Sequence, residues 1–151
     1  MKDYAILKKR AIEIAKREEG LKLKPYLCLA GKISIGYGRN LDDVGISVIE
    51  SEFLLNNDID NAFNLLDFLF PNWDDLPERV KVVLALMSFQ LGRAGLICFK
   101  KTLAFVRAFD FEKAAKEMLD SKWAKQTPER AKRMSKIMRG DKDVNNHKKD
   151  S

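Results

Sequence analysis

The chain of 151 residues contains few residues that form disulfides, restrict the backbone or bind metals: two cysteines, four prolines and one histidine. Cys28 and Cys98 are too few for the disulfide framework of a small secreted domain, so we expect both thiols to be free. The single histidine, His147, stands alone near the carboxyl end. The sequence therefore predicts no metal site and no cofactor.

Long apolar runs are also absent. No stretch approaches the roughly 20 apolar residues that a membrane-spanning helix needs, so we expect no membrane insertion. No internal repeat is visible, and no signal-peptide core follows Met1. With 46% hydrophobic and 33% charged residues, the composition is instead typical of one soluble globular domain.

Basic residues are in excess, with 28 lysines and arginines against 22 aspartates and glutamates and a formal charge of +6. A basic surface favours polyanionic partners, which include nucleic acid, anionic membrane surfaces, and acidic sugars and peptides. Charge alone does not choose among these. The basic helix expected after Thr127 lacks base-reading and aromatic-stacking residues, so we expect no nucleic-acid binding.

Helical periodicity dominates the chain. Asp3 is expected to cap a first helix that ends by Gly20, and Ser47 with Glu50 forms the capping-box pattern of a long helix that ends near Leu69. The other expected elements are a small sheet at about 25–38 and helices at about 80–89, 100–109, 111–119 and 128–140. This order of elements predicts an α+β, mainly α protein.

The residues that can carry chemistry concentrate between Glu18 and Asn40. Glu19 lies where the first helix ends, at the negative pole of the helix dipole, which is a mildly unfavourable place for a carboxylate. A carboxyl group in such a place suits a general acid. Eight residues separate Glu19 from Cys28 and five separate Cys28 from Ser34, so the three side chains can converge if the helix end meets a hairpin.

This segment resembles the active-site segment of phage-type lysozymes, glycoside hydrolase family 24. The family pattern is a Glu, eight residues, an Asp or more rarely a Cys, five residues and a Thr, and Glu19, Cys28 and Ser34 fill it here. Ser34 keeps the hydroxyl of the family's Thr and loses its methyl group. The resemblance runs from about Tyr4 to Arg139 through Ile35-Gly36-Tyr37-Gly38, Met87-Ser88-Phe89-Gln90, Phe99-x-x-Thr102 and Ser121-x-Trp123-x-x-Gln126-Thr127-Pro128-x-Arg130.

The resemblance implies a lysozyme-like fold with a small sheet-bearing lobe, a long connecting helix and a helical lobe. We expect a single domain in which residues of about 15–58 form the small lobe and residues of about 1–14 and 70–140 form the helical lobe. Residues 141–151 are expected to be a frayed, polar tail. In the family the substrate lies in the cleft between the lobes.

The resemblance also implies cleavage of the β-1,4 bond between N-acetylmuramic acid and N-acetylglucosamine in bacterial peptidoglycan, by a phage endolysin that lyses its host. We expect a monomer that is made in the host cytoplasm. A separate membrane-permeabilising protein would then give it access to the cell wall.

In this hypothesis Glu19 is the general acid, and its neighbour Glu18 is a solvated charge. Cys28 occupies the partner position, where it can attack the anomeric carbon, assist a water molecule, or serve only as a small buried side chain. We favour direct participation, although a nearby Glu19 carboxylate would raise the pKa of the thiol. Ser34 can hold the catalytic water or orient its partner, or it can be an ordinary strand serine.

Four residues of the second half are candidates for substrate binding or support. The resemblance places Arg130 near Glu19 as a charge partner, but it can equally belong to a solvated basic face. Phe89 and Gln90 are expected at the cleft-facing end of the central helix, where Phe89 can instead be core, and Thr102 matches a substrate-contacting hydroxyl. Where the family often has a histidine this chain has Arg39, and we expect Arg39 to pair with Asp58.

Two other functions stay open. A lytic transglycosylase needs one acid/base Glu and no carboxylate partner, because a hydroxyl of the substrate closes an anhydro ring, and the missing aspartate at Cys28 keeps this alternative open. A binding module without catalysis, for wall glycan or nucleic acid, is the third possibility.

Overall fold

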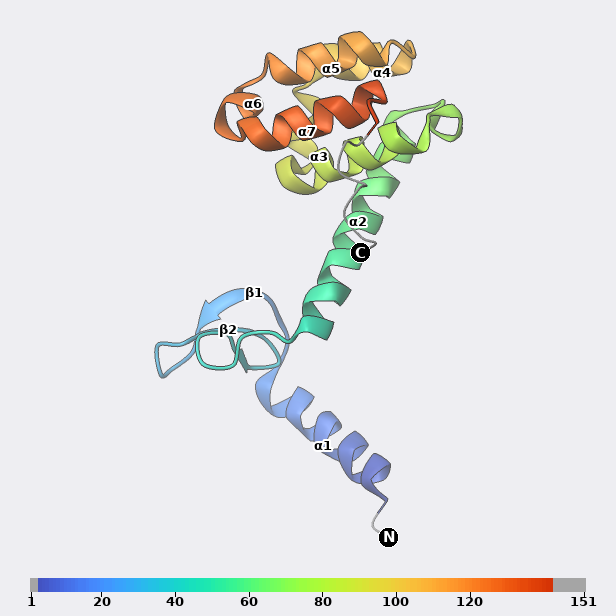
Figure 1. Cartoon of the computed structure of the whole chain (residues 1–151). Coiled ribbons are helices and arrows are strands. Elements are labelled where there is room, and N and C mark those ends of the chain that lie inside the picture. Colours follow the sequence, from blue (N-terminus) through green and yellow to red (C-terminus); the bar gives the residue numbers. More distant parts are fainter. Residues whose placement is uncertain (1–2, 143–151) are drawn as a thin grey trace, which may run out of the picture. The chain divides into compact units, whose positions relative to one another are not determined.

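The computed structural model describes residues 3–142 (Figure 1). Within that range the chain is mainly helical, with one small antiparallel sheet, which confirms the predicted fold class. Its elements are α1 (Tyr4–Glu19), β1 (Lys22–Leu27), β2 (Ile33–Gly36), β3 (Arg39–Asn40), α2 (Val48–Leu69), the short 3-10 helix η1 (Trp73–Asp75), α3 (Glu78–Ile97), α4 (Lys100–Arg107), α5 (Phe111–Leu119), α6 (Lys122–Gln126) and α7 (Pro128–Arg139).

The chain divides into two compact units, Met1–Phe53 and Leu54–Ser151, and the boundary falls within α2. The predicted lobe boundaries, with residues of about 1–14 in the helical lobe, stay a prediction. The expected frayed tail begins at Asp141, and most of it, residues 143–151, lies outside the described residues.

The first unit contains α1 and the sheet. The side chain of Asp3 caps α1 by accepting a hydrogen bond from the backbone N–H of Ala5 at 3.2 Å, and Gly20 ends the helix, as predicted. The strands follow one another in the order β1-β2-β3, with antiparallel pairing throughout. Pro25 is tolerated in β1 because β1 is an edge strand whose pairing shifts register between Lys22 and Tyr26.

The capping box predicted at the start of α2 is confirmed. The backbone N–H of Ser47 donates to Glu50 Oε2 at 2.7 Å, and the backbone N–H of Glu50 donates to Ser47 Oγ at 3.2 Å. Two donors that the helix start would leave unpaired are thereby satisfied.

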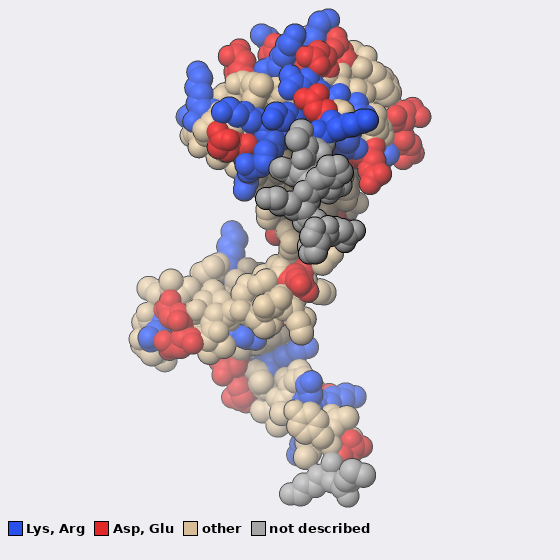
Figure 2. Space-filling model, in the orientation of Figure 1, with Lys and Arg blue, Asp and Glu red and all other residues tan. Residues whose placement is uncertain are grey.

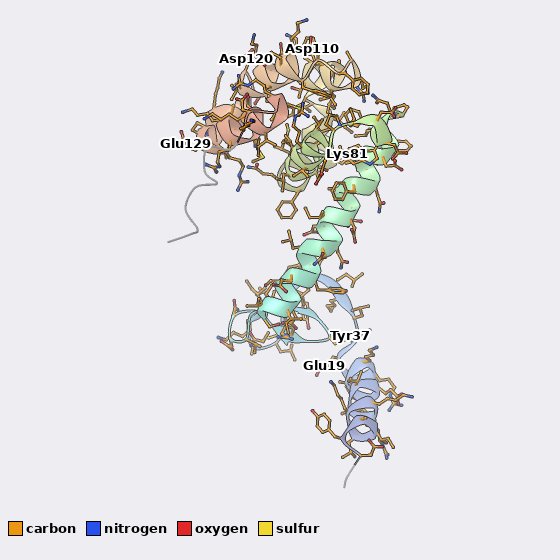
Figure 3. All side chains as sticks on the ribbon, turned by 45° about the vertical axis from the view of Figure 1, so that its right-hand side comes forward. Glu19, Tyr37, Lys81, Asp110, Asp120 and Glu129 are labelled. Carbon is orange, nitrogen blue, oxygen red and sulfur yellow. The ribbon has the colours of Figure 1, made fainter. Side chains whose placement is uncertain are left out.

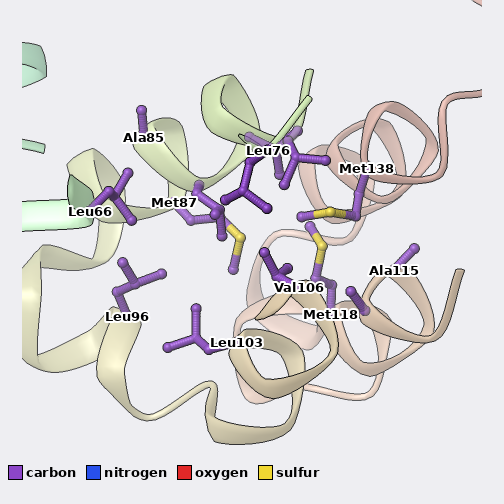
Figure 4. Close-up of a cluster of buried hydrophobic side chains, with 14 of the residues drawn as sticks. Leu66, Leu76, Ala85, Met87, Leu96, Leu103, Val106, Ala115, Met118 and Met138 are labelled. Carbon is purple, nitrogen blue, oxygen red and sulfur yellow. The ribbon is translucent and has the colours of Figure 1, made fainter. Parts of the chain in front are cut away.

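The second unit holds the apolar core, which α3 dominates (Figure 4). By length and composition α3 is apolar enough to cross a membrane, so the expectation that no stretch approaches this length is wrong. Seven residues of α3 are buried in the core of the second unit. The helix is interrupted at Gly92, whose φ of +69° and ψ of 175° are not helical, at the point where the sequence predicted a break. Met87 of α3, Val106 of α4, Met118 of α5 and Met138 of α7 are all fully buried.

Helices α4 to α7 close this core. Asp110 caps α5 by accepting from the backbone N–H of Lys113 at 3.1 Å, and the buried Ser135 of α7 donates to the carbonyl of Ala115 at 3.1 Å. Thr127 precedes Pro128 at the start of α7, but its hydroxyl donates to the carbonyl of Trp123 and does not cap the helix. Thr127 is therefore the N-cap residue of α7 by position, without a capping hydrogen bond from its side chain.

Candidate active site

Glu19 is the last residue of α1, and its carboxylate lies against the turn between β2 and β3. A Cβ atom built on Gly38 would stand 3.0 Å from Glu19 Oε2. Gly38 has φ +77°, a left-handed conformation that side-chain-bearing residues rarely adopt. A glycine at this position therefore makes both the turn and the close approach of the carboxylate possible.

Cys28 directly follows β1 and begins a tight hairpin turn. Its backbone N–H donates to the carbonyl of Lys32 at 2.9 Å, and its own carbonyl accepts from the N–H of Gly31 at 2.8 Å. Gly31 adopts φ +74° at the tip, as a turn this tight requires. Across the hairpin Ser34 lies in β2 with 3% of its surface exposed, so the sheet nearly buries its hydroxyl group.

The hairpin turn lowers the pKa of the Cys28 thiol. Hydrogen bonds from the backbone of Lys32 and then of Ala30 are the largest causes, desolvation opposes them, and the Ser34 hydroxyl adds a smaller lowering effect. We had expected Glu19 to raise this pKa, and the direction is the opposite because the turn supplies donors to the sulfur. The structure therefore places Cys28 and Ser34 in one hairpin and lowers the pKa of the thiol.

Arg39 of β3 forms an ion pair within the first unit. Its guanidinium pairs with Glu50 and donates to the carbonyl of Gly45 at 3.3 Å. Asp58 belongs to the second unit, so the predicted pair of Arg39 with Asp58 stays a prediction. Hydrogen bonds from the backbone and hydroxyl of Ser47 lower the pKa of Glu50, and Arg39 adds a smaller effect in the same direction. Arg39 thereby links the end of the sheet to the start of α2.

In the second unit Phe89, Gln90 and Arg130 line one pocket of about 210 Å³. Gln90 Oε1 accepts a hydrogen bond from Trp123 Nε1 at 2.9 Å, a contact that the sequence analysis did not anticipate. Phe89 is 47% exposed and is therefore not plain core. Arg130 is exposed on α7, and its predicted pairing with Glu19, a residue of the other unit, stays a prediction.

Thr102 lies on α4 and is only 2% exposed. It contributes to the wall of a second pocket of about 590 Å³, whose lining also includes Phe99 and Trp123 with their rings edge to face at 6.0 Å. Its burial favours a packing role over direct contact with substrate. The predicted contact stays a prediction.

Both cysteines are free, as predicted. Among residues 3–142 no three His, Cys, Asp or Glu side chains gather in a way that could hold a metal ion. The chemistry available in the first unit is therefore that of a carboxyl group, a thiol and a hydroxyl. The contact of Glu19 with Gly38 was not predicted from the sequence, although Gly38 belongs to the Ile35-Gly36-Tyr37-Gly38 motif.

Comparison with known proteins identifies the family. The model of the phage lysozyme family matches residues 16–139. The chain is 29% identical to the probable T4-type lysozyme 2 of Dictyostelium discoideum, over 83% of this chain and 91% of that protein. It is 27% identical to the pre-baseplate central spike protein Gp5 of Enterobacteria phage T4, over 83% of this chain and 27% of that protein.

The probable T4-type lysozyme 1 of Dictyostelium discoideum is 29% identical over 69% of this chain and 65% of that protein. All candidate site residues, from Glu19 to Arg130, lie inside the range that the family model matches. The chain therefore belongs to the phage lysozyme family of glycoside hydrolases.

Proposed function

We propose that this protein is a phage endolysin with muramidase activity, which cleaves the β-1,4 bond between N-acetylmuramic acid and N-acetylglucosamine in peptidoglycan. The observation that carries the proposal is the arrangement in the first unit. One hairpin and one helix end present a carboxyl group against Gly38 and a donor-supported thiol beside Ser34. Family membership supplies the substrate class.

Glycoside hydrolysis needs a proton donor for the leaving oxygen and a second group that deals with the developing oxocarbenium ion. Glu19 protonates the glycosidic oxygen as the bond from C1 of N-acetylmuramic acid to that oxygen breaks. The oxygen of a water molecule ends on C1. One proton of that water returns to Glu19, either directly or, where Cys28 accepts it first, by exchange through solvent. Every atom is then accounted for without a cofactor.

Cys28 and Ser34 act at C1. The lowered pKa of Cys28 increases the fraction of thiolate, which either attacks C1 directly or accepts a proton from the attacking water. Ser34 orients whichever group attacks. The two routes differ in the configuration of the product. Direct attack by the thiolate forms a thioether at C1, which a water molecule deprotonated by Glu19 then displaces with release of the thiolate, so the configuration is retained; direct attack by water gives inversion.

Exposed basic residues of the second unit would hold the anionic wall. Figure 2 shows lysine and arginine side chains spread over the visible face of this unit, and the exposed cations of α6 and α7 include Lys125, Arg130, Lys132, Arg133 and Lys136. Their field would raise the local concentration of an acidic polymer. The protein would act as a monomer and reach the wall through a separate membrane-permeabilising protein.

The test is release of soluble glycan from purified peptidoglycan by the wild type, Glu19→Gln and Glu18→Gln. We expect the wild type and Glu18→Gln to release fragments at similar rates. The rate of release by Glu19→Gln should be at least about a hundredfold lower, which is the lower end of what general acid catalysis contributes. Equal loss in both variants would contradict the assignment of the acid. If the wild type bound glycan and released no fragments, the protein would be a glycan-binding module and not an enzyme.

One observation supports a second candidate. The partner position holds Cys28 where a carboxylate is usual, and a lytic transglycosylase needs no carboxylate there. In that reaction the 6-hydroxyl of N-acetylmuramic acid attacks C1 in place of water, and the product carries an anhydro ring. The chemical nature of the new ends separates the two reactions.

A further inference from the structure

Two residues near Glu19 have no part in the proposed chemistry. The Nζ atom of Lys16 lies 5.5 Å from the centroid of the Tyr37 ring, within the range of a cation–π contact. Lys16 and Glu19 are three residues apart in α1 and therefore share one face of the helix. Tyr37 is the residue before Gly38, against which Glu19 lies.

One face of α1 thus meets two consecutive residues of the β2–β3 turn, Lys16 against Tyr37 and Glu19 against Gly38. Figure 3 shows Glu19 and Tyr37 together where α1 ends. The two contacts are one helical turn apart on the helix and one residue apart on the turn.

We propose that Lys16 and Tyr37 are positioning residues that hold the end of α1 in register with the turn and so keep the Glu19 carboxylate over Gly38. The inference rests on the proposed role of Glu19 as the general acid. It adds two residues to that role, and neither of them touches the substrate.

Because Glu19 lies at the end of α1, the placement of its carboxylate depends on contacts that hold the end of the helix. Glu19 is exposed and is the terminal residue of α1, where helices fray. Among the described residues 3–142, no hydrogen bond or ion pair holds its carboxylate. Its placement therefore depends on the placement of the last turn of α1, and Lys16 lies in that turn.

The sheet offers a matched control. Lys22 lies over the ring of Tyr26 at 5.2 Å, in a lysine–tyrosine contact of the same kind in the same unit. Lys22 belongs to β1, so its ammonium group does not tie α1 to the turn. Lys16→Met and Lys22→Met each remove one charge and one cation–π contact, and only the first should misplace Glu19.

The experiment measures kcat and KM on soluble, uncross-linked glycan chains of peptidoglycan for the wild type, Lys16→Met, Lys16→Arg, Tyr37→Ala, Tyr37→Phe and Lys22→Met. Lys16→Met and Tyr37→Ala should lower kcat about two- to fivefold with KM nearly unchanged, because exposed cation–π contacts are weak. Lys16→Arg and Tyr37→Phe should keep the wild-type kcat, since each preserves a cation or a ring. The kcat of the double variant Lys16→Met/Tyr37→Ala should be no lower than that of either single variant, because both changes remove the same contact.

A second readout does not need activity. Nuclear Overhauser contacts between the side-chain protons of Glu19 and the α-protons of Gly38 should be present in the wild type and Lys22→Met and weakened in Lys16→Met. If Lys16→Met matches Lys22→Met in both kcat and these contacts, the inference is wrong while the proposed function stands. A wild type without activity would overturn the proposed function, and the contacts would still decide whether the pair positions Glu19.

Discussion

The environment of Glu19 depends on the absence of a side chain at Gly38. Gly38→Ala should lower activity strongly, because a methyl group would stand 3.0 Å from Glu19 Oε2. It should also destabilise the fold by about 1–2 kcal/mol, the cost of a left-handed non-glycine residue. Gly45→Ala is the control, with φ +64° and no atom nearer than 3.9 Å. If both variants kept full activity in glycan release, the carboxylate would not work from this position.

The thiol of Cys28 makes a prediction about pH. Its pKa is lowered by donors of the folded hairpin, so the ionised thiol stabilises the folded state. This contribution is complete above the pKa of the unfolded chain and is lost as the pH falls through the lower pKa of the folded state. Ser34→Ala removes one donor and should move the pH midpoint of Cys28 alkylation by iodoacetamide upward. The measurement is made in a Cys98→Ser background, and a midpoint that does not move would show that Ser34 does not support the thiolate.

At this scale the sequence predicted the identities of the residues better than their electrostatics. The spacing of Glu19, Cys28 and Ser34 followed from the motif. The direction of the Cys28 pKa did not, because the donors that set it are backbone groups brought to the sulfur by the folded hairpin. Backbone donors are present at almost every residue, so the sequence does not indicate which of them lie near the sulfur.

Among the elements, the start of α2 carries the most informative contact. Glu50 uses Oε2 for the capping box and Oε1 for Arg39, so one carboxylate serves both the helix and the sheet. The contact between Arg39 and Glu50 was not predicted, since the sequence pattern assigned Glu50 to the capping box alone. The short elements β3 and α6 were also missed, because stretches of two and five residues carry no periodicity.

Double-mutant cycles should detect the Arg39–Glu50 pair. Ser47→Ala removes the cap alone and should cost roughly 1 kcal/mol of unfolding free energy, while Glu50→Ala should cost more because it also removes the ion pair. The coupling between Arg39 and Glu50 should be about 0.2–1 kcal/mol, as for other partly exposed pairs. The same denaturation experiment tests the expected pair of Arg39 with Asp58. A coupling of zero between these two residues would remove that pair, and a coupling as large as that of Arg39 with Glu50 would support it.

Across the whole molecule, the buried apolar side chains are unevenly distributed. Among the described residues, every buried hydrophobic side chain lies between Ala62 and Met138, in the second unit, whereas the first unit contributes the buried hydroxyl of Ser34. Local opening depends on the apolar surface that must be exposed, so the first unit should open at a lower free energy than the second. Amide hydrogen exchange should therefore be slowest in α3 and α5. Slowest exchange in β1 and β2 would contradict this distribution of stability.

The core of the second unit can be probed by a matched pair of variants. Leu84→Ala removes a fully buried side chain and should lower the free energy of unfolding by about 2–5 kcal/mol. Leu86 is 38% exposed, so Leu86→Ala should lower it clearly less. Urea denaturation followed by circular dichroism measures both. A comparable loss in the two variants would mean that Leu84 is not part of the core.

The most direct test of the proposed function is mass spectrometry of the fragments released from purified peptidoglycan. Hydrolysis by water predicts new reducing ends on N-acetylmuramic acid, which disappear with Glu19→Gln and fall sharply with Cys28→Ala. Anhydro ends would contradict hydrolysis and identify a lytic transglycosylase, and reducing ends on N-acetylglucosamine would show that a different bond is cut.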